Sequence, residues 1–158
     1  MTMCGGRSLG DRAMLARRGF LVVASFALSG IALAAGELTV AEIEGVSRLA
    51  GVRAVAKGAV PGAQGAQNFV GADGTLLLIV SLGTAKDYRD AREAFGKPTA
   101  VGGLGDEAFH PADFDHALYA RKGERMVGLG SGLNASTGKA ILSQAQLQAL
   151  AKLLVGRI

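Results

Sequence analysis

Both histidines of the chain and several carboxylates lie within eleven residues, from Asp106 to His116. Imidazole nitrogens and carboxylate oxygens are the ligands that zinc, copper and other divalent cations take in proteins. Four side chains are therefore candidate metal ligands: Asp106, His110, Asp113 and His116. The alternative is a polar hairpin end in which the aspartates are turn residues. Pro111 separates the two histidines, so they converge only if the intervening loop is tight.

Histidine-dependent catalysis in this chain would have to use His110 or His116 as its general base. A glycine-rich run, Gly128 to Gly132, followed by Gly138-Lys139, is superficially similar to a phosphate-binding loop. Five residues instead of four separate the last two glycines, and Ala140 replaces the hydroxyl residue that holds magnesium. We interpret these glycines as small residues on a strand or a flexible rim. The sequence contains no catalytic or cofactor motif, so we expect no enzyme activity and no cofactor.

The N-terminal segment has the pattern of a signal peptide. Arg17-Arg18 precedes an uncharged run from Gly19 to Ala34 that ends in Ala-Leu-Ala. We predict a signal peptide over residues 1–34, cleaved after Ala34, and one mature domain over 35–158. The alternative is that this segment stays uncleaved as an anchor. The paired arginines also suit a twin-arginine signal, the general secretory route remains open, and Met14 is an alternative start.

The expected location is therefore the periplasm or the exterior, with membrane contact only through the transient signal segment. The net charge of +4 is concentrated near the N-terminus. Four arginines and one aspartate precede residue 35, which leaves 13 basic and 12 acidic residues in the mature domain. So balanced a domain does not suit nucleic acid as a partner. Its sequence also contains no cysteine, because Cys4 lies in the leader.

Three segments have the spacing of helices. Thr39 with Glu42, and Ser143 with Gln146, form capping boxes, each followed by apolar residues at helical intervals. We expect the first helix to run toward a stop at Gly51, with Leu49 and Ala50 on its inner face. A further helix is expected to start at Thr84 and to end near Gly96.

Alternating or continuous apolar runs predict the strands. They cover residues 52–59, 67–71, 75–82, 107–110, 115–121 and 125–133. Asp73-Gly74 and Lys122-Gly123-Glu124 are expected to be hairpin turns. The predicted fold is α+β, with a mainly antiparallel sheet of about five to six strands covered by two to three helices.

A short pattern in the chain resembles one known group of proteins. It comprises the run Gly103-Leu104-Gly105-Asp106-Glu107-Ala108-Phe109, the triplet Arg121-Lys122-Gly123, and the opening Leu38-Thr39-Val40-Ala41-Glu42. It is similar to small exported actinobacterial and proteobacterial proteins and lipoproteins of unknown function. The resemblance implies a PsbP-like α+β fold and export, and it implies no activity. Lipid anchoring is not implied, since the lipid-attached cysteine is missing.

We therefore expect a non-enzymatic domain that binds an envelope protein, another envelope component or a small ligand. The alternative is a metal-binding or metal-delivery protein that uses the cluster at 106–116. Residues 101–116 and the loop 128–139 are the expected location of a binding site, because loops on a rigid scaffold commonly bind ligands.

The predicted processing site is testable by N-terminal sequencing. Protein recovered from the periplasm or medium of cells expressing the full chain should begin at Ala35. A protein that begins at Met1 or Met14 and stays in the cytosol would contradict both the leader and the location.

Overall fold

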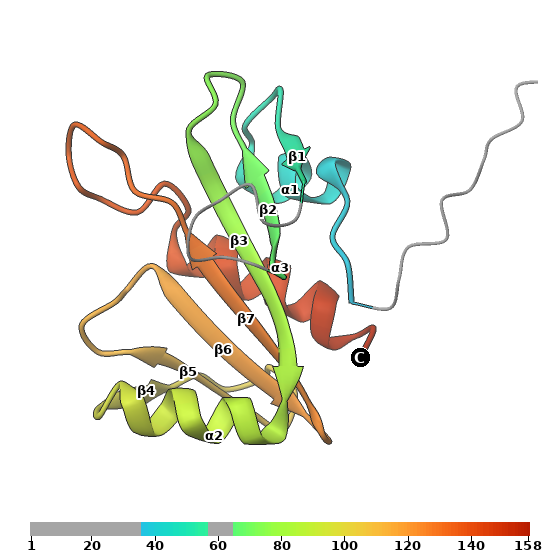
Figure 1. The fold of residues 1–158 in the computed structure, drawn as a ribbon, viewed down its shortest axis with the longest axis vertical. Coiled ribbons are helices and arrows are strands. Elements are labelled where there is room, and N and C mark those ends of the chain that lie inside the picture. The colour runs from blue at the N-terminus through green and yellow to red at the C-terminus, as the bar shows by residue number, and fades with distance from the viewer. Residues whose placement is uncertain (1–35, 57–64) are drawn as a thin grey trace, which may run out of the picture. The chain divides into compact units, whose positions relative to one another are not determined.

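The computed structural model describes residues 36–56 and 65–158, which belong to one compact unit (Figure 1). The predicted signal peptide over 1–34 lies outside these residues. So do residues 57–64, which include the end of the strand predicted over 52–59. No helix of the described part is long and apolar enough to cross a membrane.

The described residues form a sheet of seven strands in which every neighbouring pair is antiparallel. The order across the sheet is β1-β2-β3-β7-β6-β5-β4. The strands are β1 (Arg53–Val55), β2 (Gln67–Val70), β3 (Leu76–Thr84), β4 (Pro98–Ala100), β5 (Glu107–Pro111), β6 (Ala117–Lys122) and β7 (Arg125–Ser131). The predicted α+β class is confirmed, but five to six strands was too low a number. The missed strand is β4, whose three residues begin with proline and show no alternation.

Three helices are present in the described residues: α1 (Val40–Ser47), α2 (Ala85–Ala94) and α3 (Gln144–Val155). Each begins with a capping box, in which the N-cap hydroxyl accepts from a backbone N–H and a side chain three residues later accepts from the N-cap N–H. The two boxes predicted at Thr39 and Ser143 are confirmed. The third joins Thr84 to Asp87, so α2 begins directly at the end of β3.

The first helix is shorter than predicted. It ends at Ser47 because Arg48 adopts a left-handed conformation (φ 63°). The amide of Gln146, on α3, donates to the carbonyl oxygens of Val46 and Ser47 and so satisfies the end of α1. Leu49 therefore lies outside the helix and is 40% exposed, although the sequence placed it on the inner face.

The two faces of the sheet pack against different helices. On β6, Leu118 and Ala120 point to the face where they join the buried cluster of α1 and α3. Tyr119 alternates to the opposite face, where its ring packs at a tilt against Phe95 at the end of α2. Figure 1 shows α2 in front of the sheet and α3 behind it. The sheet is thus a middle layer with an aliphatic core on one side and an aromatic one on the other.

The beginning and the end of the described domain are joined by a charged side chain. Arg157 donates to the carboxylate of Glu42 and to the carbonyl oxygen of Glu37, at 2.6 Å for the latter. The hydrogen bond from Arg157 is the main cause that lowers the pKa of Glu42 to about 2, against the opposing effect of its burial. Glu42 also completes the capping box of α1. One carboxylate therefore fastens the start of the first helix to the C-terminal segment.

Candidate functional site

The four predicted metal ligands are not brought together. His110, on β5, is 4% exposed, and its Nδ1 lies 2.6 Å from the carbonyl oxygen of Ala117. Its Nε2 is 3.5 Å from the amide nitrogen of Gln148, so the ring faces α3. His116 is outside the strand and packs edge-on against Phe114, at 5.5 Å between ring centroids.

The two aspartates have different surroundings. Asp113 is exposed in the loop between β5 and β6, whereas Asp106 accepts a hydrogen bond from the backbone of Gly123. Across residues 36–56 and 65–158, no three histidine, cysteine, aspartate or glutamate side chains lie close enough to hold a metal ion. Strand alternation and the separate anchoring of each side chain explain why closeness in sequence does not become a ligand set.

The glycine-rich run that is similar to a phosphate loop lies mostly on β7. A Cβ at Gly128 would lie 2.5 Å from the hydroxyl of Ser81 and 3.2 Å from the ring of Tyr119. A Cβ at Gly132 would overlap the carbonyl oxygen of Leu76. These glycines therefore allow the neighbouring strands and the aromatic side to pack closely, which agrees with their interpretation as small residues of a strand.

The segment Gly103–Phe109 and the triplet Arg121-Lys122-Gly123 form one structural unit, which we call the glycine clasp. The backbone N–H of Asp106 donates to the carbonyl oxygen of Arg121 at 2.8 Å. Its carboxylate accepts from the backbone N–H of Gly123, also at 2.8 Å. Gly105 has a positive φ of 63°, and a Cβ there would overlap the Arg121 carbonyl oxygen. The clasp thus fastens the start of β5 to the turn between β6 and β7.

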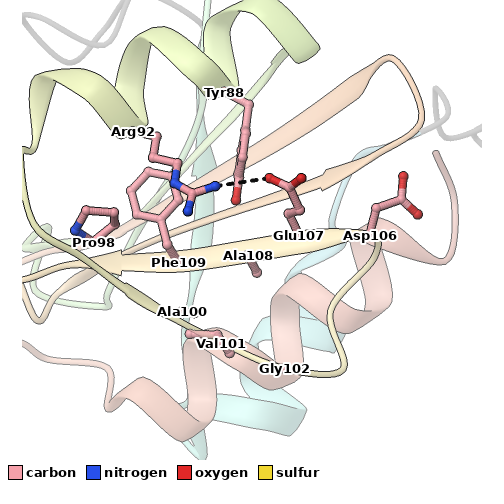
Figure 2. A pocket seen from close by; sticks show the side chains of 10 residues that line it. All are labelled: Tyr88, Arg92, Pro98, Ala100, Val101, Gly102, Asp106, Glu107, Ala108 and Phe109. Atoms are coloured by element: carbon pink, nitrogen blue, oxygen red, sulfur yellow. Dashed lines mark hydrogen bonds and ion pairs between the residues drawn. The ribbon is translucent and has the colours of Figure 1, made fainter.

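Beside the clasp lies a hollow of about 250 Å³ between α2 and the strands β4 and β5, which we call the α2 groove. Figure 2 shows its lining residues. They are Tyr88, Arg92, Pro98, Ala100, Val101, Gly102, Asp106, Glu107, Ala108 and Phe109. An adjoining hollow of about 350 Å³ shares three of them, Tyr88, Arg92 and Glu107, so these three separate the two spaces.

A chain of three charges joins the α2 groove to the adjoining hollow, which Arg121 lines. Arg92 donates from Nη1 to one carboxylate oxygen of Glu107 at 3.3 Å. Arg121 donates from Nη2 to the other oxygen, also at 3.3 Å. The Arg92 and Glu107 side chains are 53% and 46% exposed, against 23% for Arg121. Solvent screens the Arg92–Glu107 pair, so it contributes little to stability and can be broken at little cost.

The phenol of Tyr88 reaches the same place from α2. Figure 2 shows its hydroxyl beside the Arg92–Glu107 ion pair. Burial raises the pKa of Tyr88, and the negative charge of Glu107 raises it further. The hydroxyl therefore stays protonated at neutral pH and is available as a hydrogen-bond donor.

The ring of Tyr88 begins a row of aromatic side chains that supports α2. It packs edge-on against Phe109 at 5.3 Å between centroids, and Phe109 stacks on Tyr119 at 5.1 Å. Tyr119 contacts Phe95, which in turn contacts Phe114. Such pairs add about 0.5–1.5 kcal/mol each beyond area burial, so they fix the helix over the sheet. The polar edge of the α2 groove is therefore held by a rigid wall.

A larger hollow, of about 490 Å³, lies among three loops elsewhere on the domain. It is lined by Leu49, Ala50, Gly71, Ala72, Asp73, Thr75, Leu77, Asn134, Ala135, Ser136 and Ile141. Two of its polar groups are already engaged in local turns, since Asp73 accepts from Thr75 and Asn134 accepts from Ser136. Its larger volume favours this loop hollow as a binding site. The α2 groove is favoured by polar groups that converge and are only partly engaged within the protein.

The α2 groove is lined by part of the segment 101–116 and by two residues of α2, Tyr88 and Arg92. The types of these two residues do not mark them as a site, because a tyrosine suits the inner face of a helix and an arginine among alternating charges suits a solvated face. Their spacing of four places them on the same side of a helix. Glu107 pairs across the sheet with Arg121, which becomes apparent only when the register is known. Comparison with protein-family models, with curated proteins and with solved structures found no match for the chain.

The glycine clasp can be tested with two matched substitutions. Gly103 and Gly105 both have positive φ, but a Cβ at Gly103 would meet nothing within 4 Å. We expect Gly103→Ala to cost about 1 kcal/mol of unfolding free energy, from backbone strain alone. Gly105→Ala should cost about 2 kcal/mol more, because the methyl group displaces the Arg121 carbonyl. Urea denaturation measures both, and equal losses would contradict the close approach.

Proposed function

We propose that this chain is an exported, non-enzymatic domain that binds a small ligand or an envelope partner in the α2 groove. The observation that supports the proposal is the set of polar groups that meets there over an apolar floor. Arg92, Glu107 and the Tyr88 hydroxyl converge beside the ring of Phe109. Hollows with apolar walls and a few converging polar groups are the usual form of binding sites.

The composition of the groove favours binding over catalysis. Neither His110 nor His116 lines it, and its charged groups are arranged as ion pairs. A guanidinium and a protonated phenol are hydrogen-bond donors at neutral pH, and a carboxylate is an acceptor. Such a set suits recognition of a ligand by charge and by hydrogen bonds.

The export part of the proposal rests on the leader at 1–34. The location is the periplasm or the exterior, reached by the twin-arginine or the general secretory route. The proposal also includes kinship with the small exported proteins that have the GLGDEA and RKG pattern, and their PsbP-like fold. The glycine clasp gives that pattern a structural reason, because its residues hold one another by backbone contacts.

A fragment screen by NMR tests the binding site. Protein recovered after export from cells expressing the full chain is labelled with ¹⁵N and mixed with small polar fragments. We expect binding fragments to shift the amides of Tyr88, Arg92 and Glu107. The substitution Arg92→Gln should weaken the binding of these fragments about tenfold, because it removes the exposed cation.

Arg53→Gln is the matched control, since it removes an exposed guanidinium from β1, a strand that does not line the groove. It should leave fragment affinities unchanged. Shifts confined to the loop hollow around Asn134, or equal binding to the Arg92→Gln variant, would overturn the assignment to the α2 groove.

A further inference from the structure

We infer that the ligand of the α2 groove is a small zwitterion, specifically an α-amino acid with an apolar side chain. This inference rests on the proposed function and adds a chemical class to it. It follows from the charges that face each other in the groove, from its apolar walls and from its size.

The cation of the groove is free to change partners. Arg121 is engaged three times, by Asp106, by Glu107 and by the carbonyl oxygen of Gly123 at 2.8 Å. Arg92 is engaged once, by Glu107 through Nη1. Its Nη2 and Nε have no hydrogen bond within the described residues. Arg92 can therefore turn to a ligand carboxylate, which a guanidinium binds best through two parallel hydrogen bonds.

Turning Arg92 away leaves an acceptor behind. Glu107 stays fixed through the oxygen that Arg121 holds, while its second oxygen loses Arg92. A ligand ammonium group satisfies that oxygen, and the Tyr88 hydroxyl can donate to the ligand carboxylate beside it. A zwitterion thus replaces one ion pair by two and leaves no charge unpaired. A ligand with only a carboxylate leaves an oxygen of Glu107 without its cation, and a ligand with only an ammonium group leaves Arg92 without an anion.

The remaining walls and the volume limit the ligand's size and polarity. Phe109, Pro98 and Ala100 form an apolar surface that can accept an aliphatic or aromatic side chain. A hollow of about 250 Å³ is smaller than the range occupied by drug-sized ligands. One amino acid fits such a space better than an extended peptide or a lipid.

The test is a titration of the exported protein with five L-amino acids, namely leucine, isoleucine, valine, methionine and phenylalanine. At least one should shift the amides of Tyr88, Arg92, Glu107 and Ala100 in a saturable manner. For leucine, the matched analogues are 4-methylpentanoate, which lacks the ammonium group, and 3-methylbutylamine, which lacks the carboxylate. The corresponding deamino and decarboxy analogues are used for whichever amino acid binds.

Each analogue should bind about tenfold more weakly than the amino acid, or not at all. Arg92→Gln should reduce amino-acid affinity by about the same factor, and Arg53→Gln should not change it. Glu107→Gln should weaken the amino acid and leave the affinity for the carboxylate analogue unchanged or higher, a pattern that misfolding would not produce.

The outcomes separate this inference from the proposed function. If a singly charged analogue binds as tightly as the amino acid, the zwitterion is wrong and the groove remains a binding site. If no amino acid binds but other fragments shift the groove, the ligand class is again wrong while the site stands. If neither the amino acids nor the other fragments shift the amide resonances of the groove, both the ligand class and the proposed binding site are wrong.

Discussion

The backbone of Gly105 runs against the carbonyl of Arg121 so closely that a side chain has no room there. This approach lets the N–H of Asp106 reach the same carbonyl and lets its carboxylate reach the N–H of Gly123. The contact lies on the sheet itself, because Arg121 belongs to β6 and Glu107 begins β5. The position of β5 in the sheet, and hence of everything attached to it, depends on this contact.

The α2 groove is a consequence of that constraint. Once β5 is fixed, Glu107 faces Arg121 across the strands, and Phe109 lies on the same side two residues later. The aromatic row then holds α2 above them, which brings Tyr88 and Arg92 over the carboxylate. The tightly packed aromatic row therefore lies next to the exposed Arg92–Glu107 ion pair. Binding sites commonly combine these two properties, with rigid walls around a few adaptable polar groups.

Much of the fold follows from local chemistry that the sequence displays. The capping boxes at Thr39 and Ser143, the turns at Gly74 and Gly123 and the continuous apolar run of β3 act over a few residues, and the structure contains all of them. The predicted end of α1 was wrong because the helix is capped by Gln146, about a hundred residues away, whose amide donates to the last carbonyl oxygens of the helix. β4 was missed because a three-residue edge strand has no periodicity of its own.

The candidate site was harder to predict, since it depends on which strands are neighbours. Closeness in sequence suggested a metal cluster, but His110 turns to α3 while Asp106 turns to a hairpin. The groove instead joins α2 to β5, whose residues are separated by a connector and an edge strand. Amide hydrogen exchange tests the central contact most directly. We predict that the Asp106 N–H exchanges as slowly as the amides of β6 and β7, through global unfolding. Rapid exchange of that N–H, with the strands still protected, would contradict it.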